Sequence, residues 1–472
     1  MTGIEERTDR DGEHLILGLT VRALGAWPAG WRHPGAHRDP AVDGAVLARL
    51  ATSAEKAGLD FLFFGDWLAT APEYQYTDPY LLARIEPFAA VGYLAALTER
   101  IGLIVTANSV HSDPYAVARA TASLDLLSRG RIGLNLATGA EARSASNFGS
   151  DVVPSAPDRL AAAAEYLEIV RSLWDSWQDD AIVADDGTGE FIDPTRIVAT
   201  NFTGYYHSSS GPLNVLRPPQ GHPPVMLAGS SSGARDLGAT YADICLVSPP
   251  TLDDAIVAYA DAKERVAASG RDPRAHHLVT PILPIAGRTR AEAWDRYDRL
   301  VDLVQLEDLR GAPAGLPANR TLRALAGVLG VPLTGVQLDE AVPLRVSARF
   351  SELGRRLVEV VRSRSGRTIG GERSTTYRHL LVAHSVVAPI IVGSADDIAN
   401  HLETWFRRSA IDGFTVLTPY LDDQLDAFTE LVLPELQRRG LFRTGYTGTT
   451  LRDHLGLPVP HNVHLSVPSS HR

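Results

Sequence analysis

The feature that most constrains the fold is a repeated alternation of short apolar segments with amphipathic helical segments. Each apolar segment has about 4 to 7 residues, the usual strand length, and a helix of ordinary length follows it. This alternation is typical of βα units. Strands are predicted at residues 14–20, 60–64, 101–106, 131–137, 225–228, 243–247, 278–285 and 411–417. We therefore predict an α/β fold in which eight parallel strands close into a (β/α)8 TIM barrel.

Two stretches do not follow the repeat. Residues 178–224 contain clusters of Gly, Pro and Ser, and residues 303–393 mix helical and loop patterns. We interpret both as insertions into a single barrel domain that spans residues 14–457. The polar residues 1–13 and the aperiodic residues 458–472 are predicted to be flexible tails. Because barrel active sites lie at the carboxyl ends of the strands, an insertion on that side would shape substrate access.

Composition excludes several classes of partner. The formal net charge of −11 over 472 residues gives no positive field for nucleic acid or for an anionic membrane surface. No segment approaches the run of about 18 apolar residues that a membrane span needs. The chain has a single cysteine, Cys245, which excludes an intrachain disulfide and suits a reducing cytoplasm. We therefore predict a cytoplasmic protein. The fifteen histidines show no metal-ligand spacing, so we predict no metal.

The strongest local motif is Gly-Ser-Ser-Ser-Gly at residues 229–233. It follows the apolar strand and precedes a predicted helix that begins at Ala234. Free amide groups at a helix N-terminus, with serine hydroxyls and no bulky side chains nearby, suit a phosphate group, and we assign Ser230 and Ser231 to that role. A serine that only caps the helix explains the same residues. The motif leaves both readings open.

The same five residues match G-x-S-x-G, the nucleophile elbow of α/β-hydrolases. Ser231 would be the nucleophile of such an enzyme. The reaction would also need an acid and a histidine, and Asp243, Asp412 and His384 are the candidates later in the chain. A serine hydrolase is therefore an alternative function.

Polar residues also stand at the predicted carboxyl ends of other strands. Asp66 follows the second strand and Thr106 ends the third, which are positions that read as functional in a barrel. His33 and His111 lie in the loops after the first and third strands and are candidate catalytic acids or bases. The chain contains no G-x-G-x-x-G motif between a strand and a helix. An oxidoreductase without a nicotinamide site must receive its electrons from elsewhere.

A series of ordered motifs carries a resemblance to one family. They are Gly30–Pro34, Phe63–Asp66, Glu86–Phe88, Thr98–Leu103, Ala122–Ser128, Asn147–Gly149, Leu173–Trp177, Gly211–Asn214, Pro218–Gly221 and Pro434–Leu441. Over nearly its whole length the chain resembles the luciferase-like, FMN-dependent two-component monooxygenases. This group includes nitrilotriacetate monooxygenase, dibenzothiophene-sulfone monooxygenase and the large subunit of pristinamycin IIA synthase.

The resemblance implies a function and a site. A separate NAD(P)H:flavin reductase would supply reduced FMN, which would react with O2 to a C4a-peroxyflavin and oxygenate a small organic substrate. Asp66 and Thr106 would contact the flavin ring region, Thr138 would bind the cofactor, and Ser230 with Ser231 would hold the phosphate. The implied fold is the bacterial-luciferase-like barrel, and the implied assembly is a homodimer or larger homo-oligomer. The catalytic residues are not implied.

The chain departs from the family pattern beside the expected phosphate site. The family has a histidine and a tyrosine where this chain has Ala156 and Leu160, around a retained Arg159, and a Thr-Ser pair where this chain has Thr138-Gly139. Losing two neutral hydrogen bonds of about 0.5 to 1.5 kcal/mol each would weaken phosphate binding by roughly 5- to 100-fold. The departures leave two further alternatives, an oxidoreductase that uses deazaflavin F420 and a non-catalytic subunit.

Overall fold

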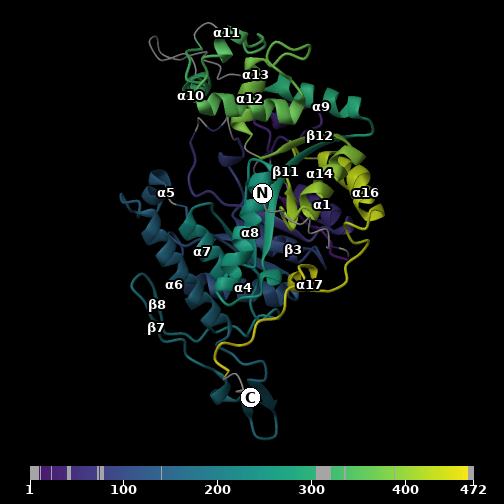
Figure 1. Cartoon of the computed structure of the whole chain (residues 1–472). Coiled ribbons are helices and arrows are strands. Elements are labelled where there is room, and N and C mark those ends of the chain that lie inside the picture. Colours follow the sequence, from purple (N-terminus) through teal and green to yellow (C-terminus); the bar gives the residue numbers. More distant parts are fainter. Residues whose placement is uncertain are drawn as a thin grey trace, which may run out of the picture.

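The barrel and the layers around it are seen in a computed structural model of the chain (Figure 1). It describes residues 10, 12–22, 24–39, 44–71, 74, 79–139, 141–304, 320–333, 336–386, 388–421 and 423–465. Strands occupy the centre, helices surround them, and a further group of helices, α10 to α13, lies at one pole.

Eight parallel strands form a closed barrel. They are β1 (Ile16–Thr20), β2 (Phe61–Phe64), β3 (Gly102–Asn108), β4 (Ile132–Ala137), β9 (Val225–Ala228), β10 (Ile244–Leu246), β11 (His277–Gly287) and β13 (Gly413–Val416). Neighbours pair in the order β1, β2, β3, β4, β9, β10, β11, β13, and β13 returns to β1. This closure confirms the predicted barrel. A ninth strand, β12 (Ile390–Ser394), was not predicted and pairs with the extended end of β11.

Helices pack around the outside of the barrel. They are α1 (Gly44–Lys56), α3 (Pro87–Ala95), α4 (Pro114–Ser128), α5 (Ala142–Asn147), α6 (Ala156–Trp174), α7 (Ser232–Tyr241), α8 (Leu252–Ala268), α14 (Ala395–Arg407), α15 (Asp423–Ala427) and α16 (Leu433–Arg438), with the π-helical segment η5 (Phe428–Val432) between the last two. Local sequence sets where several of them begin. In α4, Asp113 accepts a hydrogen bond from the Ala116 amide at 3.0 Å, and Pro114 occupies the first turn.

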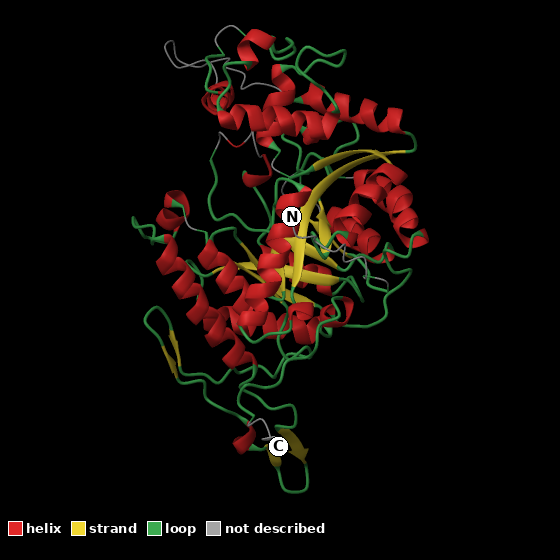
Figure 2. Cartoon of the chain, in the orientation of Figure 1, coloured by secondary structure: helices red, strands yellow, loops and turns green. Residues whose placement is uncertain are grey.

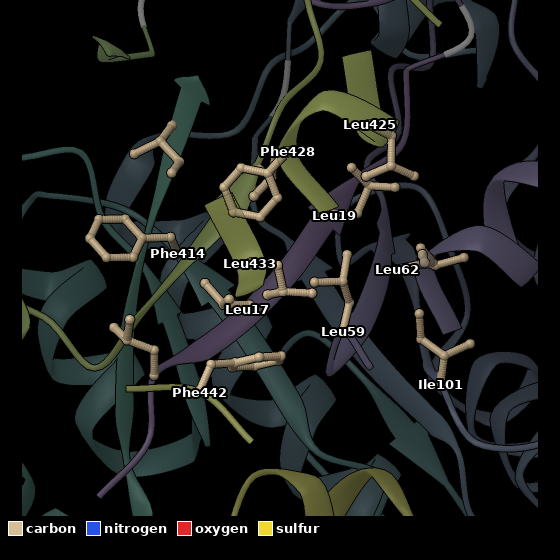
Figure 3. Packing of buried hydrophobic residues seen from close by; sticks show 14 of the residues in the cluster. Leu17, Leu19, Leu59, Leu62, Ile101, Phe414, Leu425, Phe428, Leu433 and Phe442 are labelled. Carbon is tan, nitrogen blue, oxygen red and sulfur yellow. The ribbon is translucent and has the colours of Figure 1, made fainter. Parts of the chain in front are cut away.

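The largest core cluster lies between the strands and this outer ring. Alternate residues of β1, such as Leu17 and Leu19, point outward against the helices, where Phe428 and Leu433 meet them (Figure 3). The opposite face of the strands fills the barrel interior, where Phe61 packs with further side chains from the other strands. The helix α17 (Leu451–His454) and the residues after it close the base of the interior with three leucines, Leu451, Leu455 and Leu457.

Buried aspartates hold the amino-terminal end of the barrel together. Each stands one residue before a strand and accepts a hydrogen bond from a backbone amide of a neighbouring strand: Asp60 from Leu17, Asp243 from Val225, and Asp412 from Leu278. Each also pairs with basic side chains, Asp60 with Arg443, Asp243 with Arg452 and Arg271, and Asp412 with Arg10 and Lys263.

The ion pairs at this end also shift the pKa of a buried carboxyl group. Burial alone would raise the pKa of Asp412, but the charges of Lys263, His277 and Arg10 outweigh burial and hold that pKa well below its usual value. Arg10 belongs to the predicted N-terminal tail and also donates a hydrogen bond to the carbonyl of Ile411. The end of that tail is therefore bound to the barrel, whereas residues 1–9 and 11 lie outside the described residues.

A helical layer covers part of the carboxyl-terminal side of the barrel. It contains α9 (Arg290–Leu303), α10 (Arg320–Leu329), α11 (Leu344–Ser347), α12 (Glu352–Ser365) and α13 (Tyr377–Ser385), the last four of which lie within the stretch 303–393. Its core packs on Trp27 and Tyr420, which follow β1 and β13, and Trp27 donates a hydrogen bond to the carbonyl of Leu300. The layer therefore stands on the side where a barrel carries its active site.

The stretch 178–224 lies at the other pole (Figure 2). It joins α6 to the start of β9 and contains two hairpins, β5 (Ile182–Asp185) with β6 (Glu190–Ile192) and β7 (Phe202–Thr203) with β8 (Ser208–Ser209). The C-terminal segment packs nearby. Asn462 is buried and donates to the carbonyl of Asp175, and the Val463 amide donates to the Asp175 carboxylate. Residues 458–465 are thus held against the barrel rather than free, because they complete buried polar groups there; residues 466–472 lie outside the described residues.

Candidate active site

Two adjoining cavities open at the carboxyl ends of β2 and β3. The first, called the Arg84 cavity here, is lined by residues that include Arg22, Asp66, Trp67 and Arg84. The second, the Thr106 cavity, is lined by Asp66, Trp67, Leu68, Thr106, Asn108, Ala137, Gly139, Glu141 and Ser144. Their cavity volumes are about 150 Å³ and about 250 Å³. Asp66 and Trp67 form the wall that both share.

Asp66 combines partial burial with few hydrogen bonds. Its carboxylate accepts the amide of Trp67 at 2.8 Å. Burial raises the pKa of Asp66, while the Trp67 amide and the charge of Arg84 oppose the rise. A carboxyl group that faces two cavities with a raised pKa is a candidate for contact with a ligand.

Thr106 is held firmly in its wall. Its hydroxyl donates to the carbonyl of Phe64 at 2.7 Å and accepts from the Asn135 side-chain amide at 3.0 Å. These two bonds fix the rotamer and tie together the ends of β2, β3 and β4. Thr106 therefore presents a rigid surface to its cavity, and the structure brings it together with Asp66 on the lining of that cavity.

The Ser230–Ser231 loop forms an open helix start. Ser231 caps α7, its hydroxyl accepting the amide of Ala234 at 3.3 Å, and residues 228–233 are exposed. The first turn of this ten-residue helix carries no acidic side chain. The backbone at Gly229 has φ +150°, and a Cβ there would lie 2.6 Å from that of Ala234, so glycine is needed for the turn. Unshielded amides and hydroxyls at a helix start fit a phosphate group.

The start of α6 lies beside this loop. The Leu160 side chain would come within 3.0 Å of a Cβ placed at Gly233, so residue 160 faces the first turn of α7. Arg159 donates a hydrogen bond to the carbonyl of Thr138 at 2.9 Å. The structure thus brings together Thr138, Arg159, Leu160 and the serine loop. An apolar residue stands where a hydrogen-bonding side chain could reach the helix start.

The two histidine candidates take part in aromatic stacking. His33 stacks on Tyr420 with ring centroids 4.2 Å apart, and His111 stacks on Phe148 at 4.5 Å. Burial lowers the pKa of His111, whose Nε2 atom has no hydrogen-bond partner among the described residues. Neither histidine is among the described residues that line the two cavities, so the structure does not join them to Asp66 and Thr106.

The arrangement excludes the hydrolase alternative. Ser231 follows the carboxyl end of β9, whereas Asp243 and Asp412 stand at the amino-terminal end of the barrel and are engaged in ion pairs. His384 lies on α13 in the helical layer. A catalytic triad needs its three side chains within hydrogen-bond reach of each other, and residues at opposite ends of a barrel cannot meet this condition.

The cavities are also lined by residues that were not predicted from the sequence. Arg22 stands two residues past β1, so the rule that carboxyl ends of strands carry function could have found it. Arg84, Glu141 and Ser144 lie far along loops or on α5, and no local pattern marks them. Among the described residues, no group of three or more His, Cys, Asp or Glu side chains could hold a metal ion. No helix within those residues is long and apolar enough to cross a membrane.

These features define a (β/α)8-barrel protein whose cleft lies at the carboxyl ends of its strands beside an open helix start. The family model for luciferase-like monooxygenases matches residues 26–413. The chain therefore belongs to the luciferase-like monooxygenase family, as the sequence motifs predicted. Enzymes of this family oxygenate their substrates with a reduced flavin and O2, so the chain is a flavin-dependent monooxygenase.

Individual relatives are similar in sequence to this chain along most of their length. N-acetyl-S-(2-succino)cysteine monooxygenase of Bacillus subtilis is 36% identical over 452 residues, covering 95% of this chain and 98% of that protein. Nitrilotriacetate monooxygenase component A of Aminobacter aminovorans is 35% identical, covering 95% and 98%. The structure of EDTA monooxygenase from Chelativorans sp. BNC1 superposes with a TM-score of 0.74 at 27% identity, covering 94% of this chain and 99% of that one.

Two alternative functions remain, an F420-dependent oxidoreductase and a non-catalytic subunit. Two F420-dependent enzymes superpose with TM-scores of 0.54 and 0.52 but are only 14% and 17% identical, which shows a shared fold and no more. The F420 and non-catalytic alternatives are not favoured. Relatives of this chain are components of two-component systems that need a separate flavin reductase.

Proposed function

We propose that the flavin used by this chain is FMN, which a separate NAD(P)H:flavin reductase delivers in the reduced state. The observation that carries the proposal is the exposed start of α7, where Ser230 and Ser231 offer hydroxyls and unshielded amides and the first turn has no acidic side chain. Riboflavin has no phosphate for such a site to bind. The retained Arg159, next to Thr138, adds positive charge on the adjoining α6.

The remaining site residues would bind and orient the ring. Asp66 and Thr106 border the cavities that the ring region would occupy, and the hydrogen bonds of Thr106 keep that wall rigid. When bound, the reduced flavin supplies the electrons that activate O2 for insertion of one oxygen atom into a small organic substrate. Trp67 and Ala137 present apolar surface to the same space and would limit the access of water.

His111 is the better placed of the two histidine candidates. His111 lies three residues after Asn108, which lines the Thr106 cavity. His33 instead packs beneath the helical layer against Tyr420. Since burial lowers the pKa of His111, its imidazole would be neutral near pH 7 and able to accept a proton. We assign it as the candidate acid-base residue of the site.

The assembly and location belong to the same proposal. Leu97, Leu126 and Leu127 are exposed near the ends of α3 and α4, and a second copy of the chain would cover such a surface. We therefore propose a homodimer or a larger homo-oligomer. A cytoplasmic location agrees with the lone Cys245.

The test is an anaerobic titration followed by rapid mixing with O2. The purified chain should bind reduced FMN more tightly than reduced riboflavin, and it should change the time course of flavin reoxidation relative to buffer. The matched control is Ser231→Asp, which keeps the helix cap and adds a negative charge at the phosphate position. Equal affinities for the two flavins, or reoxidation as in buffer, would contradict the proposal; tighter binding of reduced F420 would replace it with the deazaflavin alternative.

A further inference from the structure

The lining of the Arg84 cavity carries more positive than negative charge. The described groups with charge on its lining are Arg22, Asp66 and Arg84. The ring of Tyr80 contacts both guanidinium groups, with its centroid 4.0 Å from Cζ of Arg22 and 5.1 Å from Cζ of Arg84. Glu86, the next acidic residue along the chain, is exposed and caps α3 through the amides of Phe88 and Ala89. The cavity therefore has a net positive lining.

Arg84 has one satisfied edge and one unsatisfied edge. Its Nη1 atom donates to the carbonyl of Gly65 at 3.1 Å, which fixes the guanidinium at the end of β2. Its Nε and Nη2 atoms are shielded from solvent and make no hydrogen bond with any described residue. These two nitrogens lie on the same side of the planar group, and together they form the fork that binds a carboxylate through two parallel hydrogen bonds.

Within the described residues, no other arginine has two shielded nitrogens without a hydrogen-bond partner. Arg131 is buried and makes five hydrogen bonds through Nε, Nη1 and Nη2, all to groups of α3, α4 and the following loops. Arg171, Arg235 and Arg443 each have one shielded nitrogen without a hydrogen-bond partner, Nε, whereas Arg84 has two. An unpaired charged donor is costly to bury, and on Arg84 two of them lie side by side as a complete fork without an acceptor. Arg84 therefore offers a pair of donors for which the described residues supply no acceptor.

The Asp66 carboxylate does not fill this role, although it lines the same cavity. It bonds to the Trp67 amide, and no ion pair joins it to Arg84 within the described part of the chain. Burial lowers the pKa of Arg84, and the charge of Asp66 and the interaction with Tyr80, which includes a side-chain hydrogen bond, only partly oppose that effect. A bound carboxylate would supply the missing counter-charge and two acceptors.

We propose that the substrate of this monooxygenase carries a carboxylate group, which binds to the Nε–Nη2 edge of Arg84. This inference rests on the proposed placement of the flavin ring beside Asp66 and Thr106. With its carboxylate at Arg84, the substrate passes Asp66 and Trp67, the wall common to both cavities, and presents its reacting part to the Thr106 cavity. Arg84 is thus a specificity-determining residue, and the substrate class is a small organic acid.

The test compares an acid and its amide of the same shape. Pentanoate and pentanamide are titrated into the full-length protein without flavin, with binding measured by calorimetry or ligand-observed NMR. The wild type should bind pentanoate about 10- to 100-fold more tightly than pentanamide, as expected for a bidentate charge-assisted pair. Arg84→Met should reduce this ratio to about one, and Arg84→Lys, which keeps the charge without the fork, should give an intermediate ratio.

The control variant is Arg274→Met, which removes an exposed arginine at the amino-terminal end of β11 and should leave the ratio unchanged. Equal binding of the two probes by the wild type, or failure of pentanoate to bind, overturns the proposal without reliance on any variant. So does a ratio that survives in Arg84→Met. A further titration with reduced FMN and reduced riboflavin separates this inference from the proposed function. If Arg84→Met abolishes the preference for FMN, Arg84 holds the cofactor phosphate and the substrate proposal is wrong.

Discussion

Replacement of Ser231 by aspartate tests the interaction with the FMN phosphate without changing the stability of the fold. Ser231 caps α7 with φ −67° and ψ 156°, and its hydroxyl accepts a hydrogen bond from Ala234. Aspartate is as good an N-cap as serine, so the helix and its position should be preserved. The substitution removes a hydroxyl donor and places a negative charge where the FMN phosphate is proposed to bind. The expected consequence is selective loss of FMN affinity.

The size of the effect follows from Coulomb's law. Two unit charges about 5 Å apart at an effective dielectric of about 40, intermediate between the protein surface and water, repel by about 1.7 kcal/mol. A phosphate monoester carries a charge of about −1.5 to −2 at neutral pH, which raises the repulsion to about 3 kcal/mol. That energy corresponds to a roughly 100-fold larger dissociation constant for FMN. Because the loop is exposed, added salt should reduce the loss.

The assay is anaerobic equilibrium binding of reduced FMN and reduced riboflavin to the wild type and to two variants. Ser231→Asp should lose about two orders of magnitude for FMN and almost nothing for riboflavin. Ser231→Ala should lose less FMN affinity but more stability, about 1 kcal/mol, because the cap is gone. A parallel loss for both flavins would mean that the variant damages the fold. Unchanged FMN affinity would show that the serine loop only caps a helix.

Three further changes have expected outcomes. Leu160→Tyr places a hydroxyl at the start of α7 and should tighten FMN binding by about 2- to 10-fold, with riboflavin binding unchanged in the same titration. Thr106→Val leaves the Asn135 amide without its partner and should lower the free energy of unfolding by about 1 to 3 kcal/mol in urea denaturation, whereas Thr106→Ser should not. Asp412→Asn should cost about 3 to 5 kcal/mol at pH 7, because it leaves buried cations without their partner. Since the folded pKa of Asp412 lies below the unfolded value, its contribution is present above about pH 4 and is lost as the pH falls further, so the wild type and the variant should converge in acid; a constant difference across that range would refute this assignment.

Much of the fold could be predicted because each βα unit is a local pattern. Strand length, apolar content and the capping residues of the following helix lie within about 30 residues of one another. The predicted strands at 278–285 and 411–417 correspond to β11 and β13, although the helices α9 to α13 lie between them in the chain. By contrast, β12 was missed, because its pairing with β11 extends that strand beyond the barrel.

The site divides in the same way. Asp66 and Thr106 could be identified from sequence, since each stands directly at the end of a strand. Arg84 could not, because it lies 20 residues past β2 and only the fold of the intervening loop returns it to Gly65. Its importance depends on hydrogen bonds that its side chain does not make, and no sequence pattern encodes a missing partner.

The sequence by itself determined the barrel, the family, the capped helix that begins after Ser231 and the absence of a nicotinamide motif, because these depend on residues close together in the chain. Only the tertiary structure decided which end of the barrel each polar residue occupies. It separated Ser231 from Asp243 and Asp412, placed the helical layer above the carboxyl ends of the strands, and bound residues 458–465 to α6 and its neighbours. The physical reason is that burial, pairing and free hydrogen-bonding capacity arise from contacts between distant segments, which form only when the barrel closes.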